Sequence, residues 1–204
     1  VDLHGHIGFQ HDVDGTMADT EEAHRRAFNL AFQQMDLPWH WDRGLYRELL
    51  QVSGGKERIR HHWRLVQAGV TEIDGTAIDD TIEQLHALKT AAYERLVQDG
   101  LVQLRPGVQA LIEAAGAAGL RLAIATTTSP VNIAALLRQA LGPAWQHHFQ
   151  VIEDASTAPL KKPHPQVYLQ TLRHLGLAPA VALAFEDSDN GLQAARTAGL
   201  KTIV

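Results

Sequence analysis

The chain has 204 residues, of which 45% are apolar and 20% charged, as is typical of a globular protein with one large domain or a core plus a smaller companion. Its formal net charge of −5 at pH 7 gives no support for a nucleic-acid partner. It has no cysteine, which excludes disulfides and thiolate zinc sites and fits a cytoplasmic protein, and no apolar run approaches the ~18 residues of a membrane span.

The first expected element is a strand that runs into the sequence Asp12-Val13-Asp14-Gly15-Thr16. Residues two apart on a strand project from the same face, so Asp12 and Asp14 can meet one ligand together. Two adjacent carboxylates repel each other unless a divalent cation or a shared proton holds them. The motif therefore fits either a hard-metal site with one carboxylate free for catalysis or an Asx-rich surface turn.

The residues before this motif, 6–11, are more polar than the first strand of a parallel sheet normally is, because such a strand is buried on both faces. Gln10 and His11 are costly in that position unless they are hydrogen-bonded, and Gly8 weakens a strand interior. This composition leaves open a displaced or partly exposed first strand, which would also displace Asp12.

The segment from residue 17 to residue 100 shows helical periodicity and no convincing strand. Apolar residues recur at helical spacing in its first part, at Ala23, Ala27, Leu30 and Ala31. Further helices are expected over residues 45–52, 57–67 and 79–96. An insert of this length is too long for an ordinary loop after a strand, and we expect residues 17–100 to form an all-helical cap domain over the ligand edge of a sheet.

From about residue 105 onward, expected strands alternate with expected helices. The strands cover residues 120–125, 149–152, 181–185 and 201–204, and the helices cover residues 106–118, 130–141, 165–175 and 190–198. This alternation predicts the α/β fold class, with a doubly wound parallel sheet built from residues 1–16 and 101–204. In such sheets, ligands bind at the carboxyl ends of the strands.

Polar side chains gather at those carboxyl ends. Thr126, Thr127 and Thr128 follow the second strand. Lys161-Lys162-Pro163 lies just before a helix, and Glu186-Asp187 closes the strand after it. Carboxylates suit a hard metal ion, while a lysine and a hydroxyl suit phosphoryl oxygens, so the edge is expected to bind both.

These motifs resemble the four motifs of the haloacid dehalogenase superfamily of phosphohydrolases: DVDGT, a hydrophobic strand ending in threonine, KKP and EDSDNG. Their order and spacing cover nearly the whole chain. The resemblance implies a Rossmann-like core with an inserted helical cap. It also implies a phosphatase that works through an aspartyl-phosphate intermediate.

The resemblance assigns catalytic roles residue by residue. Asp12 would be the nucleophile that takes the phosphoryl group. Asp14 would be the general acid to the leaving oxygen and then the general base to the hydrolytic water. Thr126 and Lys162 would hold the phosphoryl oxygens and offset their charge, so that catalysis rests on positioning and electrostatic stabilisation.

The resemblance also implies Mg2+ as cofactor. Asp187 would bind the metal together with Asp12 and the backbone carbonyl of Asp14. Glu186 would support that metal site.

Two segments of the expected cap, residues 20–29 and 53–59, are similar to the CbbY and β-phosphoglucomutase branch, as are residues 125–129 of the core. This similarity implies a small sugar bisphosphate as substrate, with xylulose-1,5-bisphosphate as the first candidate. The substrate-binding residues that it implies are Glu21, His24, Lys56, Arg58, Thr127 and Asn132. A solvated helix start at Lys56 and Arg58, and a core histidine at His24, are the alternatives.

Other functions stay open at this point. The enzyme alternatives are β-phosphoglucomutase-like phosphoryl transfer and phosphoglycolate hydrolysis. The non-enzyme alternatives are a catalytically impaired scaffold and a phospho-acceptor domain. The impaired scaffold stays open because His11 stands where the family usually has an aromatic or aliphatic residue. We expect a monomer or weak homo-oligomer. Val204 closes an expected strand near one side of the sheet, whereas family members continue with a loop, another strand and a helix, which leaves open whether the chain is complete.

Overall fold

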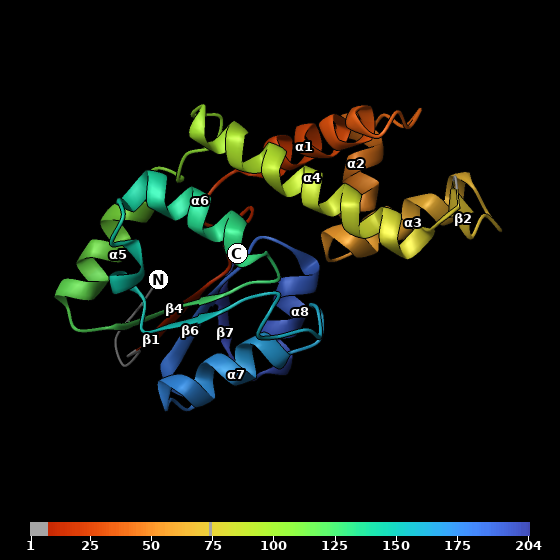
Figure 1. The fold of residues 1–204 in the computed structure, drawn as a ribbon. Coiled ribbons are helices and arrows are strands. Elements are labelled where there is room, and N and C mark those ends of the chain that lie inside the picture. Colours follow the sequence, from red (N-terminus) through yellow and green to blue (C-terminus); the bar gives the residue numbers. More distant parts are fainter. Residues whose placement is uncertain (1–7, 74) are drawn as a thin grey trace. The chain divides into compact units, whose positions relative to one another are not determined.

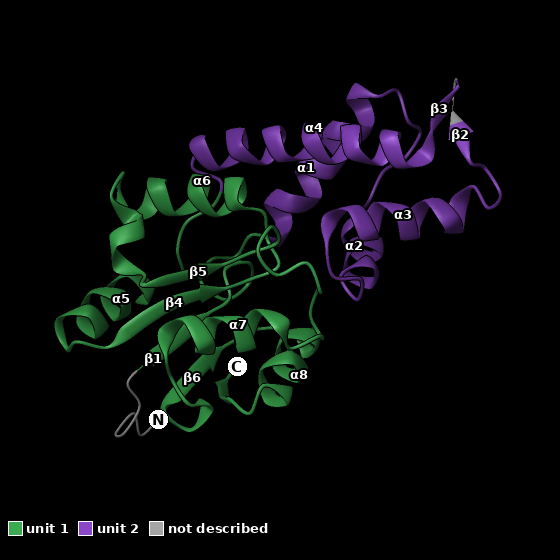
Figure 2. Ribbon diagram, turned by 60° about the horizontal axis from the view of Figure 1, so that its bottom comes forward, with its two compact units in different colours: residues 1–20, 102–204 green, residues 21–101 purple. Residues whose placement is uncertain are grey.

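The computed structural model describes residues 8–73 and 75–204 and divides them into two compact units (Figure 2). The core unit takes the chain up to Thr20 and from Val102 onward, and the helical unit takes residues 21–101. The start of the expected first strand, at His6 and Ile7, lies outside the described residues. None of the described helices is both long and apolar enough to cross a membrane.

The core unit contains a five-stranded sheet in the order β5-β4-β1-β6-β7, with every neighbouring pair parallel. The strands are β1 (Gly8–His11), β4 (Arg121–Ala125), β5 (Val151–Glu153), β6 (Ala182–Phe185) and β7 (Lys201–Ile203). The predicted α/β class with a parallel sheet is confirmed.

Helices cover both faces of this sheet, as Figure 1 shows: α5 and α6 lie on one side, and α7 and α8 on the other. Their bounds are α5 (Val108–Ala117), α6 (Pro130–Leu141), α7 (Gln166–Leu175) and α8 (Asp189–Thr197). Short 3-10 helices precede β5 and β6, η1 (Trp145–His148) and η2 (Pro179–Val181). The apolar cluster under α7 and α8 includes Ala123, Val167, Tyr168, Leu172, Ala184 and Ala194.

Local sequence explains where several helices begin and end. Helix α6 has the predicted bounds, because the Ser129 hydroxyl caps its first turn and Gly142 ends it. Helix α5 starts two residues later than predicted. Pro106 lies in a turn before it, and Gly107, with φ of +88°, forms the N-cap in a left-handed conformation.

The first strand is neither displaced nor exposed. Strand β1 is central, pairing with β4 on one side and β6 on the other, and all four of its residues are buried. The polar side chains of β1 therefore lie in the middle of the core. Because β1 is a central strand, Asp12 lies at the carboxyl end of a central strand, as expected for this kind of sheet.

The helical unit packs its helices around aromatic side chains. The helices are α1 (Glu21–Gln34), α2 (Arg43–Leu49), α3 (Gly55–Val66) and α4 (Ile78–Gln98). Its buried cluster includes Phe28, Phe32, Trp39, Trp41, Trp63 and Leu85. Leu30, which the helical spacing placed on the apolar face, is 40% exposed.

The helical unit also contains a short hairpin that corrects the prediction of a segment without strands. Strands β2 (Glu72–Ile73) and β3 (Thr76–Ala77) pair antiparallel. Each is only two residues long, so no alternating pattern can reveal it. The signal that remains is Gly75, which has a φ of +77° in the connecting turn.

Candidate active site

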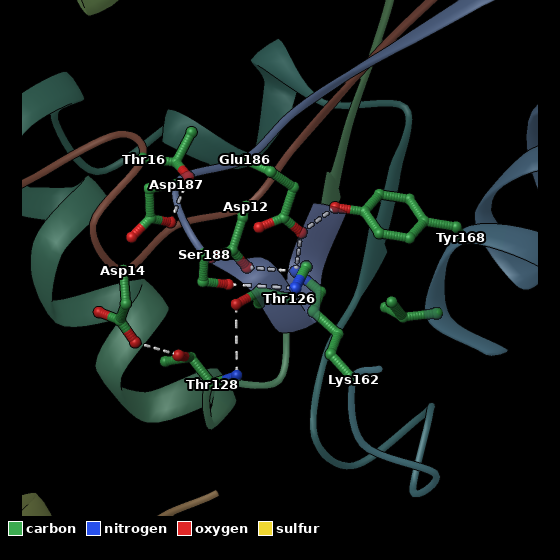
Figure 3. A network of polar contacts seen from close by, with 12 residues as sticks. Asp12, Asp14, Thr16, Thr126, Thr128, Lys162, Tyr168, Glu186, Asp187 and Ser188 are labelled. Atoms are coloured by element: carbon green, nitrogen blue, oxygen red, sulfur yellow. Dashed lines mark hydrogen bonds and ion pairs between the residues drawn. The ribbon is translucent and has the colours of Figure 1, made fainter. Parts of the chain in front are cut away.

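The candidate site lies at the carboxyl edge of the sheet in the core unit (Figure 3). Asp12 follows β1 directly, and its backbone N–H donates to the carbonyl of Phe185 on β6 at 3.1 Å. Glu186 follows β6, and its N–H donates to the carbonyl of Ile203 on β7 at 3.0 Å. The sheet ladder therefore fixes both carboxylates at the same edge.

Lys162 joins these two carboxylates. Its Nζ lies 2.8 Å from Asp12 Oδ1 and 2.5 Å from Glu186 Oε1, and all three side chains are buried. Burial by itself would lower the pKa of Lys162, but the negative charges of Asp12 and Glu186 hold it well above its ordinary value. Lys162 is therefore a protonated cation fixed beside Asp12.

Asp187 lies beside this ion pair and contacts the turn that follows Asp12. Its Oδ1 accepts a hydrogen bond from Thr16 Oγ1 at 2.8 Å. Gly15 has a φ of +79°, and a Cβ at that position would lie 1.9 Å from Asp187 Oδ2, so the turn requires glycine on both counts. Burial, with the charge of Asp12, raises the pKa of Asp187 to about 6.

The acidic side chains at this edge have the chemistry of a divalent-cation site. Among the described residues, Asp12, Glu186 and Asp187 each offer a carboxylate oxygen, and these oxygens lie within 4.8 Å of one another. Burial raises the pKa of Glu186 to about 7 and that of Asp187 to about 6, and the negative charge of Asp12 acts in the same direction on both. Oxygen ligands of this kind suit Mg2+ or Ca2+.

Asp14 points to a different partner. Thr128 Oγ1 donates a hydrogen bond to Asp14 Oδ2, and the N–H of Thr128 donates to Thr126 Oγ1 at 3.3 Å. The loop after β4 thus brings Thr126 and Thr128 beside the turn that carries Asp14. The sequence placed Thr128 at this edge but assigned it no role.

Two further residues contact the site that the sequence motifs did not single out. Tyr168 of α7 donates a hydrogen bond from its hydroxyl to Glu186 Oε1. Arg105 donates from Nε to the carbonyl of Gly15 at 2.9 Å. Tyr168 falls on the buried face of an amphipathic helix, so its spacing indicates only a core residue. Arg105 lies in an irregular segment without a local pattern.

The two core residues predicted to bind substrate differ in exposure. Thr127 is half-buried in the loop after β4. Asn132 is buried in the first turn of α6, where its backbone N–H donates to Ser129 Oγ at 3.4 Å. Its side-chain Oδ1 has no hydrogen-bond partner among the described residues. The substrate role of both residues stays a prediction.

In the helical unit, His24 belongs to a buried cluster on α1 and α4. Its Nδ1 lies 2.9 Å from Lys89 Nζ, and its ring stacks on Tyr93 with centroids 4.1 Å apart. Glu21 lies exposed at the start of the same α1 helix. The cluster fits a packed histidine as well as the predicted substrate role.

Lys56 and Arg58 have different partners within the helical unit. Lys56 Nζ pairs with Glu83 at the surface, at 2.5 Å. Arg58 donates to the carbonyls of Leu49 and Val52 at 3.0 and 3.1 Å, and so closes the connection between α2 and α3. These contacts give Arg58 a structural role, and the substrate roles of both residues stay predictions.

The chain is similar to a protein-family model and to several known proteins. Residues 11–199 match the model of the family described as haloacid dehalogenase-like hydrolase. The protein CbbY encoded on a plasmid of Cupriavidus necator is 53% identical over 193 residues, which cover 95% of this chain and 75% of that protein.

Solved structures of a CbbY protein are also similar to this chain. The crystal structure of CbbY from Rhodobacter sphaeroides in complex with phosphate matches with a TM-score of 0.88 at 44% identity, covering 97% of this chain and 85% of that one. A single-residue mutant of that protein, crystallised in complex with xylulose-(1,5)bisphosphate, matches with the same TM-score, identity and coverage.

Proposed function

This chain belongs to the haloacid dehalogenase-like hydrolase family and is a phosphatase, and we propose that it hydrolyses a sugar bisphosphate, with xylulose-1,5-bisphosphate as the preferred substrate. The substrate proposal is supported by the relative from Rhodobacter sphaeroides, which was crystallised with that compound. We further propose that Mg2+ is the cofactor.

One observation carries the proposed chemistry: the buried ammonium of Lys162 lies 2.8 Å from Asp12 Oδ1 at the carboxyl edge of the sheet. A carboxylate nucleophile that attacks a phosphate monoester must approach a group of like charge. A fixed cation beside the attacking oxygen offsets that repulsion and stabilises the charge on the transferring phosphoryl oxygens. Thr126, at the end of the neighbouring strand, adds a hydroxyl for the same oxygens.

In the first half of the proposed reaction, an Asp12 oxygen attacks phosphorus and the bond from phosphorus to the sugar oxygen breaks. The leaving sugar oxygen takes a proton from Asp14, so the sugar departs as an alcohol. The product on the enzyme is an aspartyl phosphate on Asp12.

In the second half, Asp14 takes a proton from a water molecule, which attacks phosphorus and releases inorganic phosphate. Asp12 returns as a carboxylate, and Asp14 is again protonated for the next cycle. Thr128, which donates a hydrogen bond to Asp14 Oδ2, would hold that carboxyl in place between the two steps.

The carboxylates of Asp12 and Asp187 would hold the proposed Mg2+, with Glu186 in support. When bound, the ion would neutralise charge on the phosphoryl group and on the crowded carboxylates. Removal of the ion with a chelator is therefore expected to abolish turnover.

The test is phosphate release from three substrates, each with Mg2+ and with chelator: xylulose-1,5-bisphosphate, phosphoglycolate and β-glucose-1-phosphate. We expect Mg2+-dependent release with the highest kcat/KM for xylulose-1,5-bisphosphate. Conversion of β-glucose-1-phosphate into glucose-6-phosphate would instead support phosphoryl transfer to the sugar. No release from any of the three by the folded protein would reject the phosphatase proposal.

A further inference from the structure

Tyr168 belongs to a buried series of polar contacts that leads through Glu186 and Lys162 to Asp12 (Figure 3). Its hydroxyl donates to Glu186 Oε1. The same oxygen accepts from Lys162 Nζ at 2.5 Å, and Lys162 Nζ lies 2.8 Å from Asp12 Oδ1. Two donors therefore converge on one oxygen of Glu186, and one of these donors also contacts Asp12.

The other oxygen of Glu186 is held by packing alone. Glu186 Oε2 is buried without a hydrogen-bond partner among the described residues. It lies against the start of α8, where a Cβ added to Gly191 would be 1.8 Å away. The orientation of the carboxylate therefore depends on its Oε1 oxygen, and so on Tyr168 and Lys162.

The ring of Tyr168 also contacts the lysine. Lys162 Nζ lies 5.1 Å from the ring centroid, which is within the range of a cation–π interaction. Tyr168 is 0%, Glu186 3% and Lys162 5% exposed, so water does not weaken these contacts. Burial raises the pKa of Tyr168 well above its ordinary value, which keeps the hydroxyl protonated as a donor.

We propose that Tyr168 is a positioning residue for the phosphatase reaction, whose hydroxyl orients Glu186 and whose ring supports the ammonium, so that Lys162 stays against Asp12. This inference rests on the proposed function, because it takes Asp12 as the nucleophile and Lys162 as the cation for the phosphoryl group. On this proposal Tyr168 acts through its contacts with Glu186 and Lys162.

Loss of the hydroxyl leaves Glu186 with Lys162 as its one donor among the described residues. The carboxylate can then turn about its last side-chain bond and draw the ammonium away from Asp12. The transferring phosphoryl group would lose charge stabilisation that matters most in the transition state. The effect should therefore fall on kcat and leave KM nearly unchanged.

The first experiment compares Tyr168→Phe with Thr171→Val. Thr171 is a fully buried hydroxyl one turn further along α7, and among the described residues it bonds only to the carbonyl of Val167 in its own helix, so it is a matched control. We expect Tyr168→Phe to lower kcat about tenfold, as for a lost hydrogen bond to a charged group, with KM within about twofold. Thr171→Val should keep kcat within about twofold. An unchanged kcat in Tyr168→Phe would overturn the proposal.

A double-mutant cycle then separates positioning from general stability. If Tyr168 acts through Glu186, the Tyr168→Phe change should lower kcat less than about twofold in a Glu186→Met background, where no side-chain oxygen accepts from the tyrosine hydroxyl. A full tenfold loss in that background would reject the path through Glu186. Urea unfolding of each variant shows whether any loss of kcat follows a loss of stability.

A third measurement needs neither turnover nor a folded Tyr168→Phe variant. The chain has three tyrosines, so fluorine NMR of protein labelled with 3-fluorotyrosine gives three resonances, which Tyr46→Phe and Tyr93→Phe assign. Glu186→Gln should shift the Tyr168 resonance and leave the other two in place. A Tyr168 resonance that stays in place would contradict the proposal. If wild-type protein released no phosphate, the proposed function would fail. The change in the Tyr168 resonance would still decide whether the Tyr168 hydroxyl interacts with Glu186.

Discussion

Strand β1 and the turn that follows it both bury polar side chains, but their surroundings differ. In the strand, neither polar atom of the Gln10 amide has a hydrogen-bond partner among the described residues, nor does His11 Nε2. At the turn, buried Asp12 pairs with buried Lys162, and Thr16 donates a hydrogen bond to the exposed carboxylate of Asp187, which follows β6. Burial is costly for Gln10, His11, Asp12 and Lys162, and of these four only Asp12 and Lys162 form an ion pair that offsets the cost and builds a charged site.

The neighbours of the strand residues explain how the strand tolerates them. Gln10 lies in register between Ala123 and Ala184, whose small side chains leave room for it. The ring of His11 stacks on Phe185, with centroids 4.6 Å apart and an interplanar angle of 7°. The His11 ring therefore packs as an aromatic ring would, while its Nε2 has no hydrogen-bond partner among the described residues.

The largest effect is expected in the turn, where Asp12 pairs with Lys162, from the substitution Asp12→Asn. An amide cannot serve as the nucleophile, so kcat should fall at least about a thousandfold, as it does when other enzymes lose a nucleophile. The fold should persist, because Lys162 keeps its contact with Glu186. Phosphate release and urea unfolding measure the two effects. Asp189→Asn, an exposed acid at the start of α8, is the matched control and should turn over normally. Normal turnover by Asp12→Asn would mean that the nucleophile is misassigned.

The next largest effect concerns His11 and pH. Burial lowers the pKa of His11 from 6.5 to about 4, so the folded protein binds this proton less readily than the unfolded chain does. The contribution of neutral His11 to stability is thus fully present above pH 6.5 and is lost as the pH falls toward 4. Between pH 7.5 and pH 5 the loss should be about 2 kcal/mol.

His11→Phe isolates this contribution, because phenylalanine keeps the stacked ring and cannot be protonated. Lowering the pH from 7.5 to 5 should reduce the free energy of unfolding of the wild type by about 2 kcal/mol more than that of the variant. Glu186 and Asp187, whose raised pKa values act in the opposite direction, are present in both proteins and cancel in the comparison. Parallel pH dependence of the two proteins would show that His11 finds a partner for its proton.

The sequence predicted the architecture well where local signals and burial agree. Helix α6 has the predicted bounds because a serine cap and a terminal glycine mark them, and the strands β4 and β6 are short apolar runs. The β2–β3 hairpin was missed because two-residue strands carry no periodicity. The central position of β1 was also not evident, since Gln10 and His11 contradict the apolar pattern of such a strand.

The candidate site could be predicted only in part, and for a physical reason. Asp12, Lys162 and Asp187 lie in motifs at strand ends and helix starts, and the rule that parallel strands end at one edge brings such residues together. Tyr168 lies inside α7, where a core residue and a site residue have the same spacing. Its contact with Glu186 depends on how the helix packs on the sheet, and no local pattern carries that information.

The smallest effect is expected from removing the unpartnered amide of strand β1. Gln10→Met keeps the straight side chain and nearly its volume but takes away both polar atoms, so the free energy of unfolding should rise by about 1–2 kcal/mol. Gln109→Met, at an exposed position of α5, should change it by less than about 0.5 kcal/mol. Phosphate release should be unchanged in both variants, because Gln10 lies two residues before Asp12 and its amide makes no hydrogen bond to any described residue. If Gln10→Met is less stable than the wild type, the amide is satisfied by buried water, and the contrast between the strand and the turn disappears.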